Sequence, residues 1–370
     1  MRKISATLVL GALAASFVLC SCKKETIEPS KVPIDVSSGA PYAADFHSES
    51  ALSSDYDSTI LAHYRTGRAG SFTGVGGIRI DYRVFEKSGG SNSEKGAIML
   101  LPGRTEPIEK YAEVIRDLGN QGYSVYAMSH RGQGESQRII SDPQVGYVDD
   151  FADYVADTAT FASNVVGAKS HPKKFILAHS MGGGIAVNYL HDYPNDFDGA
   201  ALSAPMLGLN SGVWPANVTF ELSQEMVNTG KGESFVPGHG PFNPNLKFTD
   251  ADNDVTRSQA RFGAKMRVFL DHPALQLGGV SYKWLNRSLK MGYKADKSSF
   301  AREVKTRILL FQAGNDTLVR NDYEDRFCGA APACQKETFS DSYHEILMER
   351  DSIRNEALAK AIRFFNKLKR

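Results

Sequence analysis

Residues 173–184 read KKFILAHSMGGG, an apolar strand pattern that passes through a single serine into a glycine-rich helix start. A strand that turns directly into a helix holds the residue at the turn in a strained conformation with an exposed side chain. The residues two before and two after it must be small because their backbones press together, and they are Ala178 and Gly182. Glycine is more usual at the first position, so Ala178 adds some crowding. We predict a nucleophile elbow at Ser180, rather than only a tightly packed helix start.

Short apolar strands alternate with helical patterns over most of the chain. This alternation predicts an α/β fold with a mostly parallel central sheet flanked by helices. The predicted strands are 78–85, 97–101, 123–128, 174–178, 200–202, 306–311 and 335–339. The predicted helices are 108–119, 149–166, one that begins at Met181, and 345–367. We assign residues 66–209 and 301–370 to this core.

The alternation stops between residues 210 and 300, where helical stretches near 257–270 and 281–291 are joined by irregular sequence. An insertion of this length between two strands of a sheet is typical of a largely helical cap over the sheet's edge. A second small domain without a role in catalysis is the alternative. We predict the cap.

A serine hydroxyl becomes a good nucleophile when a histidine takes its proton, and a carboxylate must orient that histidine. With an elbow of this kind, the order along the chain is serine, acid, histidine. Asp316 and His344 each follow one of the last two predicted strands, so we predict that they complete a triad with Ser180. The alternatives are an aspartate that only caps the next helix and a surface histidine. His179 is adjacent to the nucleophile, points away from it, and is interpreted as structural.

Two backbone N–H groups must face the negative charge that develops on the substrate oxygen. The first is predicted at Met181, at the start of a helix whose dipole favours negative charge. The second comes from the turn after the second predicted strand, where Gly103 permits a sharp bend and Arg104 supplies the N–H. Glu106-Pro107 is interpreted only as a helix start.

The first 22 residues differ in character from the rest. Two basic residues precede a short apolar stretch at 4–19, which favours an export signal over a membrane span. The motif Leu-Cys-Ser-Cys at 19–22 resembles the lipobox of bacterial lipoproteins, with Cys22 as the lipid-bearing residue. We predict a lipoprotein signal peptide at 1–21, a flexible tether at 22–65 and a lipid-anchored protein of the bacterial cell envelope. The alternative is an ordinary signal peptide.

Two cysteines of the predicted mature chain, Cys328 and Cys334, lie close together in the sequence. In an oxidising compartment they can form a disulfide, and two free thiols are the alternative. We expect no metal, because Met348 stands where a second histidine would have to follow His344-Glu345 in a zinc-binding helix. The 43 basic and 42 acidic residues give a net charge of +1, which does not favour nucleic acid as a partner.

Several stretches in this order resemble the bacterial lysophospholipases, within the α/β-hydrolases that include the monoacylglycerol lipases. They are PGR at 102–104, HRGQG at 130–134, ILAHSMGG at 176–183, SAPM at 203–206, DRFC at 325–328 and YHEIL at 343–347. The resemblance covers about residues 70–368. It implies an α/β-hydrolase fold and a serine hydrolase that cleaves single acyl esters without a metal or organic cofactor. Monoacylglycerol lipases usually begin the oxyanion turn with His-Gly, whereas this chain has Pro-Gly, as the lysophospholipases do.

Together these features predict a carboxylic ester hydrolase that forms an acyl-enzyme on Ser180. The resemblance implies a small lipid substrate, a lysophospholipid or a monoacylglycerol. A general esterase, an acyltransferase or a peptidase can use the same residues, since the insertion determines the acyl pocket. The alternative from a different class is a surface lipoprotein that binds ligands without catalysis.

Overall fold

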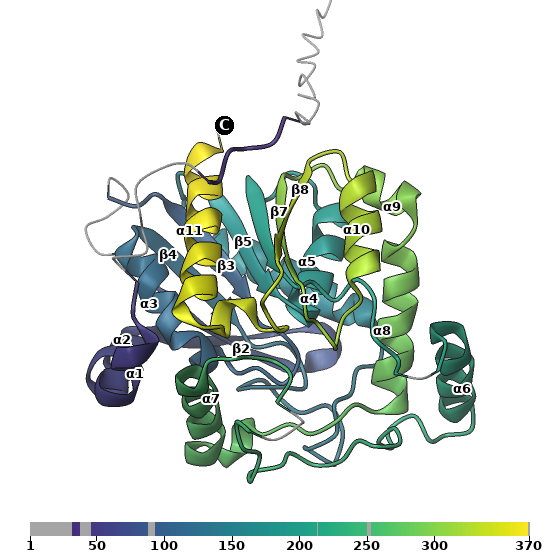
Figure 1. Ribbon diagram of the computed structural model, residues 1–370. Helices are drawn as coiled ribbons and strands as arrows, with labels where there is room; N and C mark the ends of the chain where they lie inside the picture. Colours follow the sequence, from purple (N-terminus) through teal and green to yellow (C-terminus); the bar gives the residue numbers. More distant parts are fainter. Residues whose placement is uncertain (1–31, 38–45, 88–92, 213, 250–252, 369–370) are drawn as a thin grey trace, which may run out of the picture.

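The computed structural model describes residues 32–37, 46–87, 93–212, 214–249 and 253–368. Its centre is an eight-stranded sheet in the order β1-β2-β4-β3-β5-β6-β7-β8 (Figure 1). The strands are β1 Arg68–Thr73, β2 Arg79–Phe85, β3 Gly96–Leu101, β4 Tyr123–Met128, β5 Lys174–His179, β6 Gly199–Ser203, β7 Ile308–Ala313 and β8 Cys334–Phe339. β1 and β2 pair antiparallel with their neighbours, and the remaining pairs are parallel. The prediction of a mostly parallel sheet is confirmed.

The central strands are apolar along their whole length. Every residue of β3, β4, β6 and β7 is buried. Helices on both faces of a parallel sheet bury both sides of each strand, so these sequences show no polar alternation. The edge strand β1 is mostly exposed, and its sequence RAGSFT has no apolar run. For that reason the sequence pattern does not predict it.

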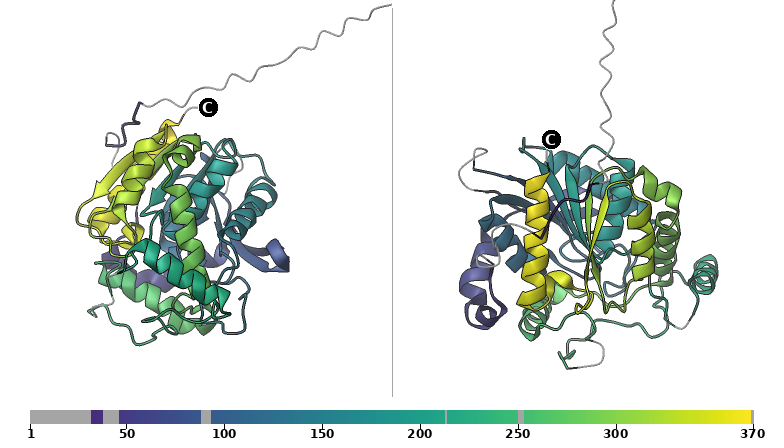
Figure 2. Two further views of the ribbon diagram at one scale, coloured as in Figure 1. Left: turned by 90° about the vertical axis from the view of Figure 1, so that its right-hand side faces the viewer. Right: turned by 45° about the horizontal axis from the view of Figure 1, so that its top comes forward.

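Helices cover both faces of the sheet (Figures 1 and 2). The helices α3 Ala112–Asn120 and α11 Asp351–Lys367 lie on one face, and α4 Phe151–Phe161 and α5 Met181–Asp192 lie on the other. Short helical turns extend this set: 3₁₀ Ile108–Tyr111 before α3, π-helical Ala162–Val166 after α4, and 3₁₀ Ile346–Met348 before α11. The last helix therefore begins at Asp351 rather than at the predicted residue 345.

Between β6 and β7 the chain leaves the sheet for the insertion, residues 210–300. It contains α6 Ala216–Asn228, α7 Gln259–Asp271, 3₁₀ Pro273–Leu275 and α8 Tyr282–Ala295, and α9 Ser298–Glu303 leads back toward the sheet. α7 and α8 match the two predicted stretches. α6 is not predicted from the sequence, and among its residues only Ser223 is buried. In Figure 1 these green segments lie mainly along the lower end of the sheet, with α8 along one side.

Residues 46–66, most of which were predicted to belong to a flexible tether, are folded onto the domain. They include α1 Glu49–Asp55, π-helical Tyr56–Leu61 and α2 Ala62–Thr66. α1 contacts α7, and α2 contacts α3. Buried side chains recur at every fourth residue, at Leu52, Tyr56, Ile60 and Tyr64. This spacing produces one apolar helix face, which the polar composition of the segment conceals. The tether prediction is wrong here.

Residues 32–37 also contact the domain: Val36 is buried, and the N–H of Ile34 donates to Gln335 Oε1 at 3.0 Å. The predicted signal peptide at 1–21 and lipid-bearing Cys22 lie outside the described residues and stay predictions. Within the described residues, none of the helices has the length and apolar character needed to cross a membrane.

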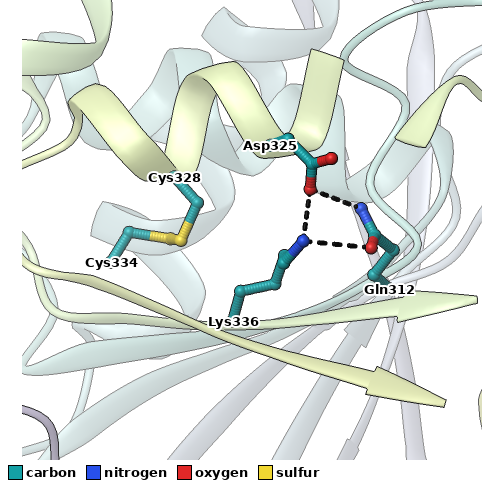
Figure 3. Close-up of a disulfide and its surroundings, with 5 residues drawn as sticks. All are labelled: Gln312, Asp325, Cys328, Cys334 and Lys336. Carbon is teal, nitrogen blue, oxygen red and sulfur yellow. Dashed lines mark hydrogen bonds and ion pairs between the residues drawn. A yellow bond between two sulfur atoms is a disulfide. The ribbon is translucent and has the colours of Figure 1, made fainter. Parts of the chain in front are cut away.

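A disulfide joins Cys328 of α10, Asn321–Ala330, to Cys334 at the start of β8 (Figure 3). A polar cluster reinforces this junction. Lys336 of β8 forms an ion pair with Asp325 of α10, and Gln312 of β7 hydrogen-bonds to both, to Asp325 Oδ1 at 2.9 Å and to Lys336 Nζ at 3.1 Å. These links hold α10 against β7 and β8, the two strands that precede Asp316 and His344.

Candidate active site

Ser180 lies at the turn between β5 and α5, with φ 51° and ψ −119°. This positive φ is the strained conformation expected of a nucleophile elbow. This tight turn brings the start of α5 very close to the end of β3. A Cβ added at Gly182 would lie 2.3 Å from the Leu101 carbonyl oxygen and 2.4 Å from that of Pro102. The glycine is therefore required by packing, whereas Ala178 is fully buried and its methyl group is accommodated.

The structure brings the three predicted triad residues together. His344 Nε2 lies 2.8 Å from Ser180 Oγ, and His344 Nδ1 lies 2.6 Å from Asp316 Oδ2. The other oxygen of Asp316 accepts the N–H groups of Leu318 at 2.9 Å and Val319 at 3.0 Å. These two bonds to Oδ1 fix the carboxylate so that Oδ2 faces the imidazole.

Parallel strands bring the three residues to the same edge of the sheet. Ser180 follows β5, Asp316 follows β7 and His344 follows β8, each at the carboxyl end of its strand. The side chains of Asp316 and His344 are only 0% and 4% exposed. Neither alternative, a surface histidine or an aspartate that only caps a helix, fits this arrangement.

The surroundings of His344 and Asp316 shift the pKa of both side chains. Burial lowers the pKa of His344, but the charge and hydrogen bond of Asp316 outweigh it, so the pKa is raised above the ordinary 6.5. Burial raises the pKa of Asp316, and His344 together with the two backbone N–H groups brings it below its ordinary value. The aspartate is thus ionised at neutral pH and stabilises a protonated imidazole.

The turn after β3, residues 102–105, is held from several sides in the position predicted for the oxyanion site. His130 Nε2 donates to the carbonyl of Pro102 at 3.0 Å. Gln133 donates to the Gly103 carbonyl at 2.7 Å and accepts the Thr105 N–H at 3.2 Å. Both residues belong to the HRGQG stretch, which thereby acquires a structural role. Burial lowers the pKa of His130 to about 4, so its ring is a neutral donor.

The two N–H groups predicted to form the oxyanion site belong to Arg104, within this turn, and to Met181, directly after Ser180. Within the described part of the chain, neither the Arg104 N–H nor the Met181 N–H has a hydrogen-bond acceptor. An N–H group that the fold leaves unpaired beside a nucleophile is available to a developing oxyanion. The geometry is therefore compatible with the predicted roles of both backbone groups.

A cavity of about 860 Å³ lies over Ser180 and His344. Much of its wall comes from the insertion, with apolar side chains such as Met226, Val236, Phe262, Trp284 and Leu285. The large side chains of Trp214 and Leu222, which also line it, are 60% and 56% exposed. The volume and lining are those of a site for an apolar ligand of substantial size.

Comparisons with known proteins identify the family of the chain. The sequence profile of the family described as serine aminopeptidase, S33, matches residues 92–351. The chain belongs to this family. Lysophospholipase L2 of Escherichia coli (strain K12) is 33% identical over 308 residues, which cover 80% of this chain and 86% of that protein. The monoacylglycerol lipase of Mycolicibacterium smegmatis is 34% identical over 152 residues, 40% of this chain and 50% of the lipase.

Solved structures agree on the fold of this S33 family member. A thermostable carboxyl esterase from Bacillus coagulans superimposes with a TM-score of 0.67 at 17% identity, over 82% of this chain and 98% of the esterase. A monoglyceride lipase from Saccharomyces cerevisiae gives 0.63 at 19% identity, over 82% and 95%. The α/β-hydrolase fold and the resemblance to lysophospholipases and monoacylglycerol lipases are confirmed. The chain is a carboxylic ester hydrolase of this group.

The interpretation of Glu106 as a mere helix start is wrong for this S33 hydrolase. Its carboxylate is buried, accepts the N–H of Gly103, and also accepts the hydroxyl of Tyr111 at 2.6 Å. Its other oxygen forms an ion pair with Lys110. Glu106 thus fixes the turn at residues 102–105, which is predicted to supply one N–H of the oxyanion site. A lysine and a tyrosine four and five residues later were the sequence signal for such a buried carboxylate.

The same ion pair extends to the histidine loop. Lys110 Nζ lies 2.8 Å from Glu345 Oε1, and Lys265 of α7 lies 3.6 Å from that oxygen. The buried ion cluster, defined as Glu106, Lys110, Lys265 and Glu345, therefore connects the oxyanion turn, the residue after His344 and the insertion. Two carboxylates face two ammonium groups, so the cluster is balanced in charge.

His179 has the structural position expected from its place beside the nucleophile. Its Nδ1 lies 3.0 Å from the carbonyl oxygen of Ser203, and its ring is packed 4.7 Å from that of His344. Burial lowers the pKa of His179 to about 4, so the ring is neutral at physiological pH. It packs beside the general base candidate without adding a charge there.

Proposed function

We propose that the chain hydrolyses the acyl ester of a lysophospholipid or a monoacylglycerol through an acyl-enzyme on Ser180. The observation that carries the proposal is the continuous hydrogen-bond chain from Ser180 through His344 to Asp316, at the base of an apolar cavity. The similarity to lysophospholipase L2 of E. coli over most of both chains supports the acyl ester as the bond that is cleaved.

In the first half-reaction, Ser180 Oγ attacks the acyl carbonyl carbon while His344 Nε2 takes the hydroxyl proton. The N–H groups of Arg104 and Met181 donate to the oxyanion of the tetrahedral intermediate. The intermediate collapses, and His344 gives its proton to the departing alcohol oxygen. Water, deprotonated by His344, then attacks the acyl-enzyme, the bond between the acyl carbon and Ser180 Oγ breaks, and His344 returns the proton to Ser180 as the fatty acid leaves. Asp316 orients the imidazole and stabilises its cationic form throughout.

The insertion fits the role of a cap that holds the acyl chain. Its side chains Met226, Val236 and Phe262 give the cavity an apolar wall, and burial of apolar chain surface favours binding by roughly 25 cal/mol per Å². A long acyl chain uses this wall, whereas a short ester leaves most of it unfilled. We therefore place residues 210–300 in substrate selection.

The predicted lipid anchor at Cys22 belongs to the same proposal. An exported enzyme held on a membrane by Cys22 has its lipid substrates close by. Replacement Cys22→Ala should move the protein from the membrane fraction to the soluble fraction of the cell envelope. Continued membrane association of that variant would argue against the anchor while leaving the catalytic proposal unaffected.

The decisive experiment combines labelling with turnover. Purified wild-type protein and Ser180→Ala are treated with a fluorophosphonate and assayed on lysophospholipid, monoacylglycerol, short-chain esters and small peptides. We expect labelling at Ser180 and preference for the long acyl esters, with turnover reduced by about four to six orders of magnitude in Ser180→Ala. A folded wild-type protein without labelling contradicts the acyl-enzyme. Activity on peptides or short esters alone contradicts the proposed substrate.

A further inference from the structure

Among the described residues Arg104 forms no ion pair, unlike the fully buried arginines. Arg104 is one of the residues that line the cavity over Ser180, and no carboxylate in the described part of the chain forms an ion pair with its guanidinium. The buried arginines Arg131, Arg261 and Arg354 instead lie 2.7, 2.9 and 2.7 Å from carboxylates. Their charges are compensated within the fold, whereas that of Arg104 is not.

The contacts of Arg104 use only a small part of its hydrogen-bonding capacity. Nη1 donates to the carbonyl of Gly278 at 2.9 Å, and the guanidinium carbon lies 5.5 Å from the centre of the Trp284 ring. A guanidinium has five N–H donors in a planar fork that matches carboxylate and phosphate oxygens. Burial lowers the pKa of Arg104 to about 10, so the group remains cationic at neutral pH. The guanidinium therefore carries a positive charge that no carboxylate of the described residues compensates at ion-pair distance.

The other cation of the cavity wall does not have this character. Lys265 lies 3.6 Å from Glu345, within the charge-balanced buried ion cluster. An anionic ligand therefore finds its strongest complement at Arg104 rather than at Lys265. Desolvation makes an uncompensated cation costly until an anion reaches it, so binding of an anion there is favoured.

We propose that the Arg104 side chain is a phosphate subsite, and that the enzyme prefers lysophospholipids to neutral monoacylglycerols. This inference rests on the proposed function and names the substrate class within it. One residue serves both ends of the recognition: its backbone N–H faces the acyl oxygen, and its side chain binds the phosphate of the leaving group.

The covalent chemistry of a lysophospholipid fits this assignment. Three carbons and one oxygen separate its ester oxygen from its phosphorus. In arginine, three carbons and one nitrogen separate Cα from the guanidinium carbon, so the two spans are similar. A substrate with its carbonyl oxygen at the Arg104 N–H therefore has its phosphate within reach of the same residue's side chain. A monoacylglycerol has no group that can form this ion pair.

The test compares two substrates that carry the same acyl chain, lysophosphatidylcholine and a monoacylglycerol. Steady-state kcat/KM is measured for the wild type, Arg104→Gln and Arg104→Lys. We expect Arg104→Gln to lower the ratio of kcat/KM for lysophospholipid over monoacylglycerol by about 10-fold to 100-fold, as loss of a charged hydrogen bond requires. Arg104→Lys should recover part of the ratio. Glycerophosphocholine should inhibit the wild type more strongly than Arg104→Gln.

A matched control is Arg138→Gln. Arg138 likewise connects the core to the insertion through a backbone carbonyl, that of Ala274 at 2.9 Å, but does not line the cavity. It should leave the substrate ratio unchanged. Equal losses on both substrates in Arg104→Gln, with a lower Tm, would overturn the subsite and leave Arg104 as a brace for the insertion. Failure of the proposed function is distinct, because the wild type then turns over neither substrate and is not labelled at Ser180.

Discussion

The carboxylate of Glu106 accepts the N–H of Gly103, the residue directly before Arg104, whose own N–H is predicted to form part of the oxyanion site. One peptide unit thus separates a buried ionic contact from the predicted oxyanion site. Because Gln133 holds the carbonyl of the same glycine, the turn is fixed from both sides. Such preorganisation is what allows a backbone N–H to stabilise an oxyanion without a reorganisation cost.

We predict that Glu106→Gln lowers kcat about 10-fold to 100-fold with little change in KM, because the turn loses its charged acceptor while the cavity stays intact. Glu109→Gln is the control: Glu109 is three residues away, lies 3.6 Å from His272, and does not contact the turn. Steady-state kinetics of both variants measure the effect. A rise in KM with unchanged kcat in Glu106→Gln would assign Glu106 to substrate binding instead.

The pH dependence of kcat/KM should report His344. The base acts when neutral, and Asp316 raises its pKa above 6.5, so activity should rise with pH through a midpoint above 6.5. In Asp316→Asn the two largest raising interactions are lost, whereas the lowering effect of burial and the smaller raising effects of Glu345 and Glu106 remain. The acidic limb should therefore move to lower pH while kcat falls by about four orders of magnitude. An unmoved limb would mean that another group controls it.

Two glycines in helices should respond in opposite ways to replacement by alanine. Gly182→Ala drives a methyl group into the carbonyls of Leu101 and Pro102, so we expect a loss of about 1–3 kcal/mol in unfolding free energy and severe loss of activity. Gly263→Ala, within α7, meets no atom within 4 Å and should raise stability by about 0.5–1 kcal/mol. Chemical denaturation and ester turnover test both. A harmless Gly182→Ala would contradict the close approach of α5 to β3.

Glu324 of α10 should make stability depend on pH. It is fully buried, and within the described residues neither carboxylate oxygen has a hydrogen-bond partner. Burial raises its pKa well above 4.5, and the charge of Asp316 acts in the same direction. The folded state then binds more protons than the unfolded state above pH 4.5, so the unfolding free energy falls as pH rises toward the raised pKa.

We therefore expect Glu324→Gln to be more stable than the wild type by about 1–3 kcal/mol at pH 8 and nearly equal to it at pH 4. Denaturation midpoints at the two pH values give the comparison. The same difference at both pH values would show that ionisation of Glu324 is not the cause.

The sequence predicts those parts of the fold that are marked by a contiguous motif or that lie at the end of a clearly apolar strand. The strand, the serine turn and the glycines of the elbow are contiguous, so Ser180 could be chosen from one stretch of residues. Asp316 and His344 could be chosen because the carboxyl ends of parallel strands meet at one edge. Neither step needs a side-chain contact to be known.

The parts that sequence does not predict depend on contacts or on weak patterns. The role of Glu106 becomes visible only when Gly103 and Lys110 are seen to share its carboxylate. The helical segment at 49–66 has a single apolar face in a polar stretch, and its burial comes from α3 and α7 rather than from its own propensity. α6 has an exposed apolar side chain, Leu222, and little burial to mark it as a helix.

The position of the insertion also imposes an order on biosynthesis. Ser180 leaves the ribosome 164 residues before His344, with the whole cap between them. The elbow, the oxyanion turn and Glu106 can therefore assemble on a growing chain while the serine still lacks its base. On the proposed mechanism, esterase activity requires the loop after β8 that carries His344, so we expect a truncated chain that ends before residue 344 to contain the nucleophile and yet be inactive.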